Sequence, residues 1–101
     1  MDNKDAIIEA INNVEHPAIA ASLVDLGMVR DVEYQPEDQS VTLTLVLPFA
    51  NILEHVRDYM VNSLYLAIQG AGGELVSVSL AQMTDEERQV FLQMEQENWR
   101  Q

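Results

Sequence analysis

Residues 40–69 read SVTLTLVLPFANILEHVRDYMVNSLYLAIQ, and this stretch decides the fold. Its first part alternates, so that one face of an expected strand over 41–47 carries Val41, Leu43, Leu45 and Leu47. Pro48 ends that strand because proline cannot donate to a sheet ladder. After Asn51 the apolar residues recur at helical spacing as far as about Gln69, at Leu53, Val56, Met60, Leu64 and Ala67. The stretch therefore predicts a strand followed by the longest helix of the chain.

The residues before this stretch predict helices and a first strand. Apolar residues recur at helical spacing over 5–14, which predicts a short amphipathic helix. Pro17 suits the first position of a second helical segment, expected to run to about Leu26 and to close at Gly27. A strand is expected over 28–34, and the turn residues at 35–38 connect it to the strand over 41–47 as a hairpin.

The residues after the long helix predict one more strand and a last helix. The glycine-rich segment 70–73 breaks the helix, and a strand is expected over 75–80 with Val76, Val78 and Leu80 on one face. Thr84 and Glu87 form the capping-box pattern at the start of a C-terminal helix over 84–100. We expect this helix to pack on its own sheet, with a weak contact to a second copy.

Together these elements predict a single domain over 1–101. Its class is α+β, with two layers, and the elements follow the order α-α-β-β-α-β-α. The expected architecture is a small three-stranded sheet with helices packed on one face.

The composition restricts the function. Five Lys and Arg residues against seventeen Asp and Glu residues give a formal net charge of -12, and this charge repels nucleic acid and anionic membrane surfaces. The chain contains no cysteine, which excludes disulfides, thiolate catalysis and cysteine-held metal centres. We find no secretory pattern at the N-terminus and no apolar run long enough to span a bilayer, so the expected location is the cytoplasm.

Two stretches carry a resemblance to a known family. The segment 23–29, LVDLGMV, and the segment 41–45, VTLTL, are followed by a proline-led helix and a valine-rich strand. Over residues 5–80 this arrangement resembles the metal-sulfur (iron-sulfur) cluster assembly family, which includes the PaaD-like proteins and the N-terminal domain of Mrp-type iron-sulfur carriers. The closing segment 83–88, MTDEER, is similar to the tail of the Mrp-associated domains.

The chain departs from the family pattern at its reactive positions. The segment 16–18, His-Pro-Ala, stands where the family has Asp-Pro-Glu, and Ala50 stands where the family has its cysteine. The resemblance therefore implies the fold and a place in iron-sulfur protein maturation, but not cluster or thiol chemistry on this chain. It implies a divergent adaptor that binds an iron-sulfur carrier or a client protein.

Six residues are the candidates for partner binding, each with an alternative role. Asp25 beside the Leu26-Gly27 turn can instead bond local backbone, and Thr42 and Thr44 either meet solvent or line a groove. Phe49 is either an exposed anchor or a core residue, and the core is favoured. The other two candidates, next to the long helix, are Ala50 and Asn51.

We also weigh two other classes of function. His16, His55, Glu54 and Asp58 could form a divalent-metal site, although their spacing matches no dedicated motif and the structural roles are favoured. An assembly subunit of an oxygenase-type complex is the other alternative. The sequence shows no recognisable catalytic set and no phosphate-binding loop, so we expect no catalysis, no metal and no cofactor. A homodimer remains compatible with the sequence.

Overall fold

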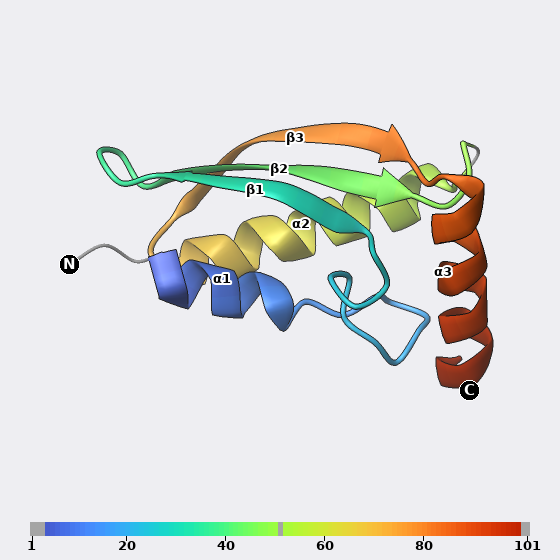
Figure 1. Ribbon diagram of the computed structural model, residues 1–101. Helices are drawn as coiled ribbons and strands as arrows, with labels where there is room; N and C mark the ends of the chain where they lie inside the picture. The colour runs from blue at the N-terminus through green and yellow to red at the C-terminus, as the bar shows by residue number, and fades with distance from the viewer. Residues whose placement is uncertain (1–3, 51, 100–101) are drawn as a thin grey trace.

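The computed structural model describes residues 4–50 and 52–99 and contains three helices and three strands in this part of the chain. The order along the chain is α-β-β-α-β-α (Figure 1). The elements are α1 (Lys4–Asn12), β1 (Val29–Gln35), β2 (Ser40–Leu47), α2 (Glu54–Gly70), β3 (Glu74–Gln82) and α3 (Asp85–Asn98). The predicted α+β class and the three-stranded sheet are confirmed.

The sheet has β2 in its centre. β1 pairs with β2 antiparallel, as the predicted hairpin requires, and β3 pairs with β2 parallel. A parallel neighbour needs a long crossover connection, and α2 is that connection. Both β1 and β3 are therefore edge strands of this sheet.

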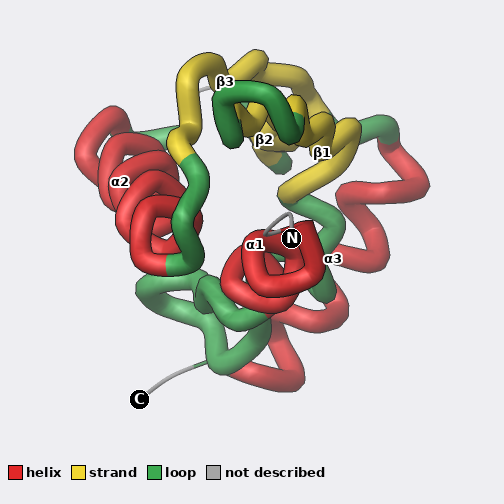
Figure 2. The backbone as a smooth tube through the Cα atoms, turned by 90° about the vertical axis from the view of Figure 1, so that its left-hand side faces the viewer, coloured by secondary structure: helices red, strands yellow, loops and turns green. Residues whose placement is uncertain are grey.

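The core lies between the sheet and two helices. Figure 2 shows α1 and α2 side by side beneath the strands. The face of β2 that carries Leu43 and Leu45 is buried, and so is the stripe of α2 that carries Met60 and Leu64. The residues that the alternation and the helical spacing grouped together therefore face this core. The expected two layers with helices on one face are thus confirmed for α1 and α2.

Gly73 lets β3 begin close to both helices. A Cβ atom placed on this residue would lie 2.7 Å from Ile7 Cδ1 of α1 and 3.0 Å from Ile68 Cγ2 of α2. These distances are shorter than carbon atoms tolerate without a shift of the neighbours. The glycine-rich break is therefore needed for close packing at Gly73 as well as for the turn.

The prediction of a second helix over 17–26 is wrong. This segment forms turns with a bridge between Glu15 and Ser22, and the backbone N–H of Leu23 donates to the carbonyl of Val14 at 2.9 Å. Ile19 and Leu23 are nonetheless fully buried. Tertiary burial of a folded-back loop accounts for the apolar pattern that resembled a helix face. Gly27 has the predicted left-handed conformation, with φ of 76°, but it closes a turn.

Two register shifts interrupt the regular alternation of the sheet. One lies in β1 between Arg30 and Glu33, where Asp31 has a positive φ of 55°. The other lies in β3, where Val41 pairs with Leu75 but Thr42 pairs with Ser77, so that Val76 is the extra residue. Such bulges add a residue to one strand and change which side chains share a face.

The C-terminal helix α3 stands at the end of the sheet, across the ends of β2 and β3 (Figure 1). Its Phe91 belongs to the buried core, and the backbone of Ile19 forms a bridge with Trp99 just past the helix end. The expectation that this helix packs on its own protein is confirmed. Its packing at the end of the sheet differs from that of α1 and α2 beneath it.

The predicted capping box is present at the start of α3. The Thr84 N–H donates to Glu87 Oε1 at 2.9 Å, and the Glu87 N–H donates to Thr84 Oγ1 at 3.2 Å. The hydrogen bond from the Thr84 backbone, then that from its side chain, and then the charge of Arg30 lower the pKa of Glu87. The carboxylate form therefore stabilises the folded chain.

This capping box makes stability depend on pH. Because the folded-state pKa of Glu87 is depressed, its contribution is complete above the unfolded-state pKa and is lost as the pH falls below about 4.5. We expect Glu87→Gln to be less stable than wild type at pH 7 and the difference to shrink at acid pH. Urea unfolding at several pH values measures this. A difference that stays constant down to low pH would contradict the assignment.

Candidate functional site

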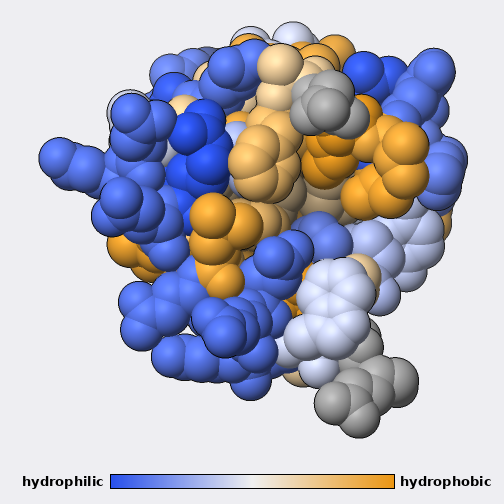
Figure 3. Space-filling model, turned by 90° about the vertical axis from the view of Figure 1, so that its right-hand side faces the viewer, coloured by the Kyte–Doolittle hydropathy of each residue, from blue (hydrophilic) through white to orange (hydrophobic). Residues whose placement is uncertain are grey.

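An exposed apolar surface covers the end of the molecule where β2 and β3 finish and α2 begins. Phe49 is 43% exposed, Leu53 is 62% exposed and Leu80 is 53% exposed. Together with the neighbouring Ala50 and Ile52 they form what we call the end patch. Figure 3 shows apolar side chains gathered on this end of the molecule above a largely hydrophilic surface. Contiguous exposed apolar surface on a protein of this size is typical of a contact site.

The end patch is built from three elements. The loop after β2 supplies Phe49 and Ala50, the approach to α2 supplies Ile52 and Leu53, and the end of β3 supplies Leu80. A depression of about 320 Å³ runs between them, lined by Leu47, Ala50, Ile52, Arg57, Leu80, Ala81 and Gln82. The depression has both apolar and polar lining, the latter from Arg57 and Gln82. It lies beside Ala50, the position at which the resembling family carries its cysteine.

Arg88 of α3 fixes the loop that carries the patch. Its Nε donates to the Pro48 carbonyl at 2.7 Å, and its Nη1 bonds Asp85 at 2.9 Å. Its guanidinium lies 5.6 Å from the centre of the Phe49 ring, within the range of a cation–π contact. The Phe49 ring is therefore held in place while part of it faces solvent. Phe49 is not the core residue that the sequence favoured.

The other predicted partner-binding residues lie elsewhere. Thr42 and Thr44 are half-buried on the face of β2 opposite the core, where Thr42 pairs with Ser77 and Thr44 with Ser79. They form hydroxyl-bearing rows on the outer face of the sheet. Asp25 is exposed in the turn before β1, and its backbone N–H donates to Ser22 Oγ at 3.0 Å. Asn51 lies outside the described residues.

The structure thus brings Phe49 and Ala50 together and places Thr42, Thr44 and Asp25 in other regions. Sequence reasoning did not identify Leu53 and Leu80 as exposed, because it assigned both to buried stripes. Leu80 lies on the same side of the sheet as Leu45, its partner in β2. β3 is an edge strand, and Leu80 near its end is open to solvent whereas Leu75 near its start is buried. The sequence pattern does not reveal this position in the sheet.

The two histidines have different surroundings. His16 is buried, and its Nδ1 accepts a hydrogen bond from the Ala18 N–H at 2.9 Å. It lies in a polar pocket with Tyr59 and Ser63, whereas His55 is exposed in the first turn of α2. Within residues 4–50 and 52–99, no group of three or more His, Asp or Glu side chains is arranged to hold a metal ion.

The fold and the end patch define a small α+β protein with an exposed apolar contact surface. Comparison with protein families then gives the particular family. The model of the family described as iron-sulfur cluster assembly protein matches residues 4–79. The chain belongs to this family, and the resemblance found in the sequence is confirmed at that level.

No curated protein matches the chain. Among the described residues no helix is long and apolar enough to cross a membrane.

Proposed function

We propose that this chain is a non-catalytic adaptor of iron-sulfur cluster assembly in the cytoplasm, which binds an iron-sulfur carrier or a client protein through the end patch. The observation that carries the proposal is the exposure of Phe49, Leu53 and Leu80 around Ala50. In a chain that belongs to the iron-sulfur cluster assembly family, an apolar surface at this position supports contact with another protein of that process.

The chemistry of the chain supports an adaptor over a cluster carrier. Thiolates are the usual ligands of iron-sulfur clusters in proteins, and the chain has no cysteine to supply them. At Ala50 a methyl group takes the place of the sulfur that the family pattern expects. We infer that this surface retained a binding role of the PaaD-like or Mrp-like type while any sulfur ligand belongs to the partner.

Rigid positioning of the patch also supports a binding role. The loop that carries Phe49 is anchored to α3 through Arg88, and α3 is itself held by buried Phe91. A surface that is ordered before binding loses less entropy when the partner arrives. The end patch therefore has the exposure and the order expected of a contact site.

Affinity capture from the source cell tests this proposal. The tagged wild-type chain is recovered from cell extract, and the proteins that accompany it are identified by mass spectrometry. We expect iron-sulfur carriers or iron-sulfur enzymes among them. Recovery of the tagged chain alone, or of proteins without any connection to iron-sulfur clusters, would contradict the proposal.

A further inference from the structure

The strand β3 has a second feature that the end patch does not explain. It pairs with β2 on one side only, and no other described strand covers its opposite edge. The N–H and C=O groups along such an edge can pair with another extended chain. Natural proteins usually protect this kind of edge with lysine, proline or inward-pointing charge.

β3 carries little of that protection. Its sequence is ELVSVSLAQ, so that no charged residue and no proline follows Glu74 within the strand. The bulge at Val76 disturbs the start of the strand, but from Ser77 to Gln82 the pairing with β2 is regular. Residues 77–82 therefore offer a regularly paired, uncharged edge of six residues.

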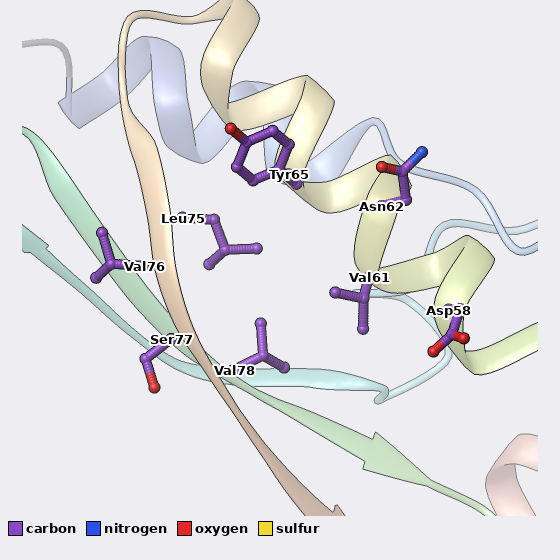
Figure 4. Close-up of a pocket in the computed structure, with 8 residues that line it drawn as sticks. All are labelled: Asp58, Val61, Asn62, Tyr65, Leu75, Val76, Ser77 and Val78. Atoms are coloured by element: carbon purple, nitrogen blue, oxygen red, sulfur yellow. The ribbon is translucent and has the colours of Figure 1, made fainter. Parts of the chain in front are cut away.

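A groove runs beside this edge, between β3 and α2. It has a volume of about 460 Å³ and is lined by Asp58, Val61, Asn62, Tyr65, Leu75, Val76, Ser77 and Val78. Figure 4 shows Leu75 and Val78 pointing toward α2, where Val61 and Tyr65 face them, while Val76 and Ser77 lie on the other side of the strand. The groove meets the regular edge at Ser77 and Val78. Because side chains of a strand alternate between its two faces, an added strand would place a side chain at this end of the edge in the groove and its neighbours on the outer face.

Charge indicates what kind of segment fits. The chain has a net charge of -12, and Glu74 begins the strand. The carboxylate of Asp58 lines the groove, where it lies 3.4 Å from the guanidinium of Arg57. Two copies of this chain would repel each other, whereas a segment with basic residues would be attracted. The regular edge also reaches Leu80 and Gln82, which line the end patch depression, so a bound strand would continue into that surface.

We propose that β3 accepts an extended, positively charged segment of a partner protein as an added strand along residues 77–82, with an apolar side chain at the Ser77 end in the groove beside α2. Strand addition uses backbone hydrogen bonds for affinity and alternate side-chain sites for specificity. The inference rests on the proposed function only in that the chain binds another protein.

A synthetic peptide provides the test. The probe has nine residues, with valine and threonine alternating and a lysine at each end, and it is titrated into the full chain. Two further peptides carry N-methyl groups on the odd or on the even residues. Because an added strand pairs through one edge, we expect one methylation pattern to abolish binding and the other to be tolerated. Backbone amides within 77–82 should gain protection from hydrogen exchange.

Matched tyrosines on α2 locate the bound peptide. Tyr65 lines the groove beside β3, whereas Tyr59 lines the pocket that contains His16. We expect Tyr65→Ala to weaken peptide binding by about tenfold and Tyr59→Ala to leave it unchanged. Circular dichroism of both variants checks that they remain folded.

Several results would overturn the inference. These are the absence of peptide binding, equal effects of the two methylation patterns, protection outside β3, or protection of β3 that rises with protein concentration without peptide, which would show pairing of two copies. The experiment contains no iron-sulfur partner. Its failure would leave the capture experiment on the end patch unaffected, and failure of the capture would not change the peptide result.

Discussion

Phe91→Ala is expected to lower the free energy of unfolding by about 3–5 kcal/mol. The Phe91 side chain is only 3% exposed and is the buried residue of α3. Its removal leaves a cavity at the end of the sheet, and the short α3 has no second buried anchor of this size to retain its position. Urea unfolding followed by circular dichroism measures the loss.

Val90→Ala is the matched control for this variant. Val90 precedes Phe91 on α3 and is 59% exposed, so its truncation should change the free energy of unfolding by less than about 0.5 kcal/mol. Similar free energies of unfolding for the two variants would contradict the described packing of α3 at the end of the sheet. Because Arg88 anchors the Phe49 loop to α3, the order of the end patch depends on the packing of α3.

The second large effect concerns partner binding. The double variant Phe49→Asp with Leu53→Asp places two carboxylates on the end patch and should weaken binding of the captured partner by at least about a hundredfold, since buried unpaired charge is costly at an interface. Both side chains are exposed in part, and Phe49→Asp also removes the ring contact with Arg88, so urea unfolding is used to check that the variant remains folded. Titration of the purified partner, followed by calorimetry, measures the affinity.

The control for the end patch adds the same charge elsewhere. Val90→Asp with Leu92→Asp alters two exposed apolar residues of α3 and should keep the wild-type affinity. Equal losses in the two double variants would mean that added charge, and not the end patch, weakens binding. An unchanged affinity for the Phe49 and Leu53 variant would place the contact on another surface.

The parts of the fold that the sequence predicted are those with strong local signals. The alternation in β2, the helical spacing of α2 and the capping box of α3 each reflect interactions between residues close in the chain. The segment 17–26 had a helical pattern, yet contacts such as the bridge of Ile19 to Trp99 hold it as a loop. The free-energy contribution of contacts between residues far apart in the chain cannot be read from the local pattern of a single sequence.

The candidate site was predicted in part for the same reason. Ala50 was identified through its position in the family pattern and lies beside the end patch depression. Leu80 is exposed near the end of β3, which is an edge strand. The partly exposed ring of Phe49 contacts Arg88, which is distant in the sequence. Sheet order and long-range side-chain contacts decide such exposure, and neither follows from local spacing.

Restoration of iron-sulfur enzyme activity in a cell without this chain tests the central claim most directly. Iron-sulfur enzyme activities are compared in cells that lack the chain and in cells that regain either wild type or the Phe49→Asp and Leu53→Asp variant at equal protein levels. We predict that activity falls without the chain and returns with wild type and with the α3 control, but not with the end patch variant. Full activity without the chain, or full rescue by the end patch variant, would contradict the account.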